Sequence, residues 1–203
     1  MKIKKFLVIH FLTLLIVIIL FKTAWTDTWA LPEKTEYLSE NKKFRFTVTP
    51  GPVGRREQGE PETCIGTLEV KEKGKNKYNT VWEKTLSNEV APVSALVTNS
   101  GTYVITFDNW HELGYGNNVI VIYNRKGNIV RQLGLNSFLS NKEIKKLPHT
   151  VSSICWGGEH HFDQNEEFVV LEISTGGKLY VDEAVKYRHI YLKLSDGTVI
   201  KNK

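Results

Sequence analysis

A strand–turn–strand pattern that occurs twice, seventy residues apart, is the strongest constraint on the fold of this chain. The stretch 120–130 (IVIYNRKGNIV) overlays 190–200 (IYLKLSDGTVI), and each consists of an apolar strand, a turn that ends in glycine and a second strand. Such a glycine supplies the positive φ that tight turns between antiparallel strands require. Upstream, 93–98 and 103–107 parallel 151–156 and 168–172. The repeat therefore predicts two four-stranded antiparallel units.

The other strand signals predict an all-β domain. Apolar and polar residues alternate in 44–48, and 65–86 reads as a hairpin of two strands around a polar turn. The run 119–123 (VIVIY) has no polar alternation, which is typical of a central strand covered on both faces. Four-stranded units in series resemble propeller blades. We expect two such sheets packed together plus an N-terminal hairpin, and two meander sheets packed face to face satisfy the same pattern.

One short helix and one long loop interrupt the strands. Ser140 and Glu143 have the spacing of a capping box, and Pro148 ends the helix predicted over 141–147. The segment 49–62 is rich in glycine and proline and predicts an exposed loop.

The first thirty residues predict export. Lys2, Lys4 and Lys5 precede the apolar run 6–21, as in a signal peptide. Counted to Trp25, the run is long enough for a helix of about 30 Å, the thickness of a bilayer core. Residues 1–30 are therefore either a cleaved signal peptide or a single-pass anchor, and 31–203 form one extracytoplasmic β domain, secreted or membrane-anchored.

Charge and cysteine content narrow the function classes. The net charge of +5 belongs mostly to the leader, because residues 31–203 alone carry +2. This modest charge, without interleaved basic and aromatic residues, argues against nucleic-acid binding. Outside the cytosol Cys64 and Cys155 are able to pair as a disulfide, and the alternative is two buried thiols.

The stretch 108–118 (DNWHELGYGNN) is the strongest candidate for a binding site, because it places polar and aromatic residues between two strands. The predicted binding residues are Asp108, Trp110, His111, Glu112 and Tyr115. The two rings of Trp110 and Tyr115 suit stacking on a sugar, while the acids and His111 suit proton transfer or metal binding. The alternative is a structured hairpin loop in which Asp108 accepts hydrogen bonds from backbone donors.

A second polar cluster, His160, His161 and Asp163, offers metal-ligand types. Adjacent histidines point to opposite faces of an extended chain, so a metal site here needs a remote ligand. The alternative is a solvated polar turn between strands.

The sequence contains no coherent catalytic set and implies no cofactor. We expect a non-catalytic binding module for an unidentified partner at the cell envelope, attached to or exported across the membrane through its N-terminal segment. The alternative function is a metal-assisted hydrolase that uses the His, Asp and Glu residues of 108–112 and 159–163.

Overall fold

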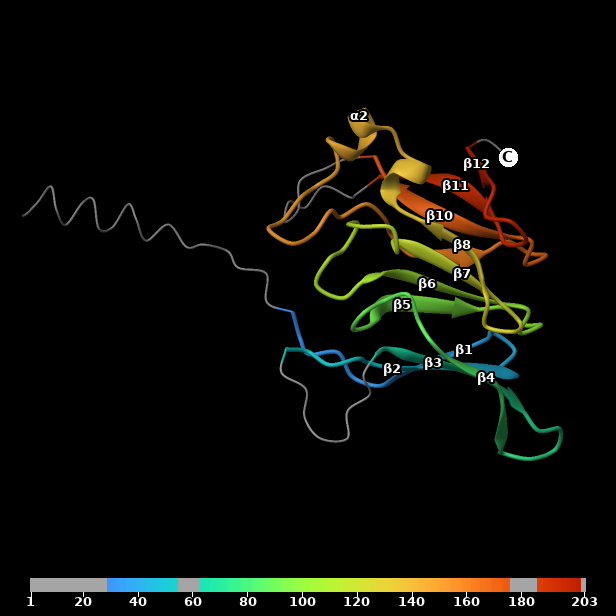
Figure 1. The fold of residues 1–203 in the computed structure, drawn as a ribbon. Helices are drawn as coiled ribbons and strands as arrows, with labels where there is room; N and C mark the ends of the chain where they lie inside the picture. The colour runs from blue at the N-terminus through green and yellow to red at the C-terminus, as the bar shows by residue number, and fades with distance from the viewer. Residues whose placement is uncertain (1–28, 55–62, 176–185, 202–203) are drawn as a thin grey trace, which may run out of the picture.

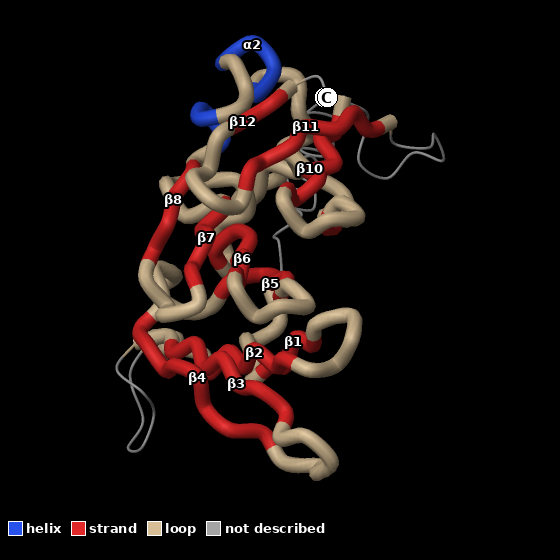
Figure 2. Tube along the Cα trace, turned by 90° about the vertical axis from the view of Figure 1, so that its right-hand side faces the viewer, coloured by secondary structure: helices blue, strands red, loops and turns tan. Residues whose placement is uncertain are grey.

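The computed structural model is all-β and consists of three four-stranded antiparallel sheets, each resembling a propeller blade (Figure 1). It describes residues 29–54, 63–175 and 186–201. In every sheet the strands follow one another in sequence order, so each sheet is a meander of neighbouring hairpins. Figure 2 shows the three sheets as successive layers.

The strands divide evenly among the sheets. The first sheet contains β1 (Thr35–Leu38), β2 (Phe44–Thr49), β3 (Ile65–Lys71) and β4 (Tyr78–Thr85). The second contains β5 (Pro92–Val97), β6 (Tyr103–Asn109), β7 (Ile120–Asn124) and β8 (Ile129–Leu133). The third contains β9 (His161–Phe162), β10 (Phe168–Ser174), β11 (Tyr187–Lys193) and β12 (Val199–Ile200).

The middle sheet is buried on both faces, and β7 shows why. Side chains alternate across a strand, so Ile120 and Ile122 face one neighbouring sheet while Val121 and Tyr123 face the other. The first pair joins the cluster shared with the third sheet, and the second pair joins Phe46 and Trp82 of the first sheet. All four residues are buried. The prediction of a central strand at 119–123 is therefore confirmed.

The N-terminal unit is more complete than a hairpin. The predicted strands 44–48, 65–70 and 80–86 are present, and β1 adds a fourth to form a sheet equal in strand number to the others. The sequence missed β1 because its four residues are mostly exposed and lack a buried face. The prediction of two blade-like units plus a hairpin is thus corrected to three four-stranded sheets.

The predicted strand at 151–156 is also corrected. The first strand of the third sheet is β9, which pairs with Val169 and Val170. Residues 149–157 instead form isolated contacts: Ile154 N–H donates to the Leu113 carbonyl, and Ser174 N–H donates to the Trp156 carbonyl. This segment therefore connects the loop of the second sheet to β10, with which Gly157 forms an isolated bridge at Ile173.

The helix is confirmed in position but is shorter than predicted. It is α2 (Asn141–Ile144), preceded by the 3-10 turn η1 (Leu135–Ser137), and its capping box between Ser140 and Glu143 is complete. The leader 1–28 and residues 55–62 of the predicted loop lie outside the described residues. Within the described part of the chain, no helix has the length and apolar character needed to cross a membrane.

Because β7 is buried on both faces, truncating one of its side chains should destabilise the protein. Ile122→Ala should lower the free energy of unfolding by about 2–5 kcal/mol, because it leaves a cavity between two sheets. Ile129→Ala on the neighbouring β8 is the matched control. Its side chain is exposed, so its effect should stay within about 0.5 kcal/mol. Urea unfolding of both variants measures the difference, and equal losses would contradict the layered core.

Candidate binding site

The loop after β6 is fixed by the carboxylate of Asp108. Gly114 N–H donates to its Oδ1 at 2.7 Å, and the indole N–H of Trp156 lies 3.0 Å from both carboxylate oxygens. Asp108 thus connects its own loop to the segment that leads into the third sheet. It occupies the left-handed region with φ 56°, which aspartate tolerates better than most residues. The alternative of a structured loop is supported for this residue.

Two further contacts hold the same loop. The buried Asn88 side chain donates to the Asp108 carbonyl at 2.9 Å and to Asn109 Oδ1 at 2.7 Å. Gly114 has φ 75°, and a Cβ there would lie 2.8 Å from the Ile154 side chain. A glycine is therefore required at position 114 by its positive φ and by its close packing on Ile154.

Burial makes the Asp108 carboxyl a weaker acid than an exposed aspartate. Its side chain is almost fully inaccessible, and loss of hydration raises the pKa of the carboxyl from 3.8 to about 6, although the bonds from Gly114 and Trp156 oppose the rise. Carboxyls shifted by burial inside a cleft are frequent at functional sites.

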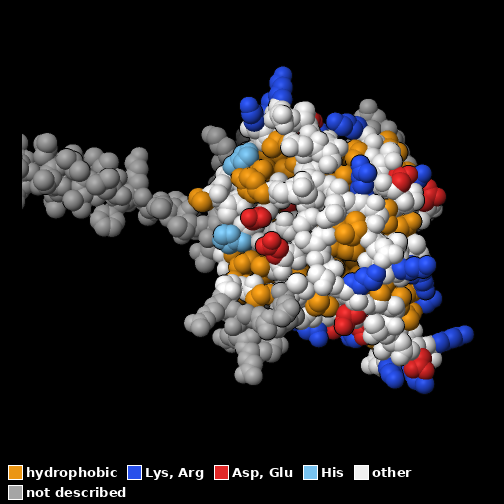
Figure 3. Space-filling view, in the orientation of Figure 1, with side chains coloured by type: hydrophobic (Ala, Val, Ile, Leu, Met, Phe, Trp, Pro, Cys, Tyr) orange, Lys and Arg blue, Asp and Glu red, His pale blue; other side chains and the backbone are white. Residues whose placement is uncertain are grey.

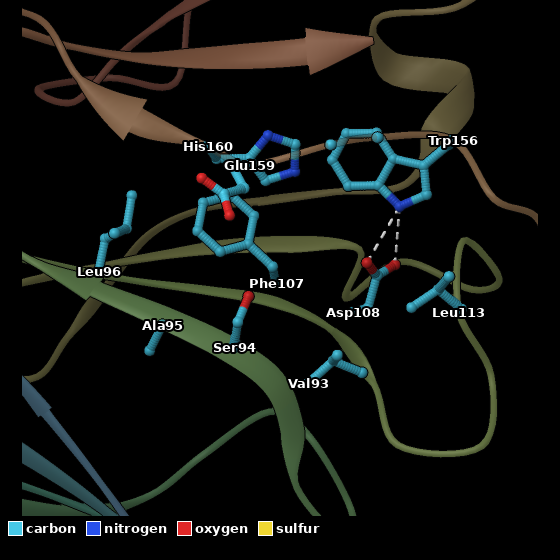
Figure 4. A pocket seen from close by; sticks show the side chains of 12 residues that line it. Val93, Ser94, Ala95, Leu96, Phe107, Asp108, Leu113, Trp156, Glu159 and His160 are labelled. Atoms are coloured by element: carbon cyan, nitrogen blue, oxygen red, sulfur yellow. Dashed lines mark hydrogen bonds between the residues drawn. The ribbon is translucent and has the colours of Figure 1, made fainter. Parts of the chain in front are cut away.

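A pocket of about 370 Å³ opens beside Asp108, between the second and third sheets (Figure 4). Its floor comes from β5, and its opposite wall comes from the segment 156–160. The lining residues are Val93, Ser94, Ala95, Leu96, Phe107, Asp108, Leu113, Trp156, Gly157, Gly158, Glu159 and His160. The two polar stretches that the sequence singled out therefore meet here, although only part of each contributes.

His160 forms the aromatic wall of this pocket. Its ring lies 4.7 Å from Trp156 in a stacked arrangement and 4.6 Å from Phe107. Nδ1 accepts a hydrogen bond from the Glu172 backbone N–H at 3.3 Å, which leaves the proton of the neutral ring on Nε2. The pKa of His160 is lowered to about 4, mainly because the ring is buried and to a smaller extent because His161 is close by. The imidazole is consequently neutral at physiological pH.

The remaining predicted binding residues lie on the far side of the loop. Trp110, His111 and Glu112 line a second hollow of about 550 Å³, together with Asn109, Asn117 and Asn118. The Trp110 indole N–H donates to the Ala30 carbonyl at 2.9 Å, so part of its polar capacity is used within the chain. Tyr115 borders a third hollow of about 410 Å³ against η1 and α2. The five predicted residues thus face three different cavities.

The predicted metal cluster does not assemble. His160 is stacked in the pocket wall, whereas His161 lies on β9 with its ring 6.4 Å from His189. Asp163 Oδ1 accepts hydrogen bonds from the backbone of Glu167 and Phe168 at 2.9 Å, which is the polar turn named as the alternative. Among the described residues there is no group of three or more His, Cys, Asp or Glu side chains arranged to hold a metal ion.

The two cysteines are not joined by a disulfide. Cys64 belongs to the core between the first and second sheets, where burial raises the pKa of its thiol to about 12. Cys155 lies in the segment that precedes the third sheet. The structure therefore has the alternative arrangement of two thiols, and Cys64 is held in its unreactive protonated form.

Sequence reasoning missed the β5 side of the pocket. Ser94, Leu96 and Val93 gave only an ordinary strand signal, and nothing local indicated that they would lie opposite Glu159. In the sequence, Trp156 was only the last residue of the segment 151–156. Its bond to Asp108 spans forty-eight residues, so no spacing rule reveals it.

Comparisons with known proteins add little. No family model matches the chain, and no curated protein is similar to it. Among solved structures, it is similar to a protein of Bacteroides fragilis to which 6-phosphogluconolactonase activity has been provisionally attributed. The match has 10% identity and a TM-score of 0.39, and covers 78% of this chain but 37% of that one. A likeness at this level carries no argument about activity.

The raised pKa of Asp108 predicts a pH-dependent stability. The folded chain holds the proton more tightly than the unfolded chain, so this stabilisation is complete below about pH 4 and is lost as the pH rises through about 6. The loss is of the order of 3 kcal/mol, and Asp108→Asn, which does not titrate, should lack it.

Urea unfolding of both proteins from pH 4 to pH 8 tests this prediction. Subtracting the two curves cancels every other titrating group. The wild-type protein should lose stability relative to Asp108→Asn across that interval, and a difference that is independent of pH would contradict the prediction.

Proposed function

We propose that the protein is an exported or membrane-anchored β domain that works as a non-catalytic binding module at the cell envelope. The observation that carries this proposal is the pocket between β5 and the segment 156–160, because it unites residues from both stretches of unusual polarity. Pockets that bind ligands are typically apolar cavities of about 300–1,000 Å³ with a few placed polar groups. This pocket has that size and composition.

The lining favours a neutral or cationic group. Val93, Leu96 and Leu113 supply apolar surface, while Ser94 and Glu159 place a hydroxyl and a carboxylate at the exposed side. None of the described residues that line the pocket is Lys or Arg. An anion would therefore meet carboxylates without a compensating positive charge. A basic side chain of a partner protein fits this chemistry.

The position of β5 suits an extended partner. It is an edge strand of its sheet, and Val93 and Ser94 on it are exposed. An edge strand presents unpaired backbone groups that a peptide is able to pair with, while pockets alongside receive its side chains. The pocket and the open edge together describe one binding surface, which we call the β5 surface.

The polar groups inside the pocket are already engaged in the fold. Both oxygens of Asp108 accept hydrogen bonds, and His160 Nδ1 accepts one from Glu172. An acid–base pair instead needs its atoms directed at a site where a substrate would react. This arrangement supports binding rather than catalysis, and no observation on the described residues favours the metal-assisted hydrolase.

A photoreactive amino acid at Ser94 tests the proposal in cells that naturally produce the protein. After illumination, the variant should cross-link to a discrete partner in the envelope fraction. The same amino acid at Thr80, an exposed position on β4, is the control and should give no such product. Both variants should keep the wild-type melting temperature.

A second variant makes the result specific for the pocket. Ser94→Trp fills its mouth and should abolish capture of the partner identified from the Ser94 cross-link. Unchanged capture, or identical products from positions 94 and 80, would contradict binding at the β5 surface.

A further inference from the structure

The loops of this domain gather at two opposite ends. At one end, the turns near residues 41, 99, 125 and 166 are connected: Asn41 bonds to Asn99, Asn99 N–H donates to Glu166, and Arg125 donates to the Ser100 carbonyl. We call this the turn end. Antiparallel hairpins alternate direction, so the loop 110–118 and the segment 134–160 lie at the other end (Figure 1).

The chain enters the fold at that other end, which we call the Trp29 end. The Ala30 carbonyl accepts the Trp110 indole N–H, and the Trp29 indole N–H donates to Ser152 Oγ at 3.1 Å. The Trp29 ring also lies 6.5 Å from Trp110 and 6.1 Å from His111. Residues 29 and 30 are therefore part of the packed domain.

These contacts bear on whether residues 1–30 are cleaved off or retained. The small residues Thr28 and Ala30 offer the poor cleavage motif of this segment. Cleavage after Ala30 would remove Trp29 and its contacts with Trp110, His111 and Ser152. Retention of residues 1–30, or a cut after Ala24, preserves these contacts, so they argue against a cut after Ala30.

The Trp29 end exposes large apolar side chains next to these contacts. Val151 is 80% exposed and Leu31 is 71% exposed, more than any other large hydrophobic residue described. Tyr115 on the neighbouring loop is also exposed. Figure 3 shows hydrophobic side chains, histidines and acidic side chains gathered on the side where the N-terminal segment joins the domain. Leaving such side chains in water is unfavourable unless a partner covers them.

The short connection between the apolar run and Trp29 limits how far the Trp29 end lies from a membrane that the run crosses. Eight residue steps separate Phe21, the last residue of the apolar run, from Trp29. A fully extended chain of that length spans at most about 28 Å. If the apolar run crosses the bilayer, the Trp29 end cannot move far from the membrane surface.

The composition of this end suits a lipid surface. Trp and Tyr are enriched at membrane interfaces, where an apolar ring and a polar tip are both accommodated. Lys145, just after α2, lines the same hollow as Tyr115, and Lys142 and Lys146 are exposed beside it in sequence. These lysines favour adsorption to anionic headgroups, whereas the exposed Glu112 and Glu159 at the same end oppose it, so the protruding apolar side chains carry the attraction.

We propose that the Trp29 end rests on the outer surface of the membrane, with Leu31, Val151 and Tyr115 in the headgroup region. The bilayer is the occupant of this apolar surface. The inference depends on the anchor alternative of the proposed function and adds an orientation: the loop 110–118 faces the lipid, and the turn end faces away.

Lipid cross-linking of the full-length chain tests this orientation. The protein is reconstituted in vesicles of phosphatidylethanolamine and phosphatidylglycerol with a photoreactive amino acid at Val151 or Leu31. Ile129 and Leu38 are the matched controls, because they are exposed hydrophobic residues, at 47% and 48%, next to the turn end. Mass spectrometry should find several-fold more lipid adducts at positions 151 and 31 than at 129 and 38.

Equal adduct yields at the four positions, or none at Val151, would overturn the proposal. So would an intact mass from the native membrane that shows cleavage at any position after the apolar run 6–21. The β5 surface is tested separately, since cross-links from Ser94 to a protein do not require lipid adducts at Val151. Failure of one proposal is therefore distinguishable from failure of the other.

Discussion

The burial of β7 on both faces is the constraint on which the rest of the structure depends. A strand with apolar side chains on each side must be covered twice, and neither neighbouring sheet alone is able to do so. The first sheet supplies Phe46 and Trp82 to one face, and the third supplies Leu171 and Ile190 to the other. Three layers are thus the smallest number that satisfies this sequence.

The outward faces of the first and third sheets carry charged and titratable side chains. The face of the first sheet that points away from the core carries Arg45, which pairs with Glu69 at 2.8 Å and with Glu36 at 3.2 Å. On the far face of the third sheet, His189 lies 4.0 Å from Glu172. Burying these groups without new partners would cost their hydration. Among the described strands, none pairs with the outer edge of β5.

Signals between neighbouring residues predicted most strands and the helix, whereas the pocket depends on contacts between residues far apart in the sequence. The strands around Val121 and the capping box of Ser140 were correct because each depends on residues close in sequence. The short strands β1 and β9 were missed because they lack a periodic apolar face. The pocket was missed because Trp156 and Asp108 meet only after two sheets have packed. Trp110 of the predicted binding loop instead bonds to the chain's own Ala30.

The bond between Asp108 and Trp156 couples the pocket to this layered core. Trp156 is buried in the cluster between the second and third sheets, so its indole cannot move without disturbing that packing. Asp108 carries a positive φ and a desolvated carboxyl, both of which are costly, and the bonds from Trp156 and Gly114 offset part of that cost. The same loop continues into Trp110, which holds Ala30. One carboxylate thus fixes the pocket wall on one side of the loop and the attachment of the N-terminal segment on the other.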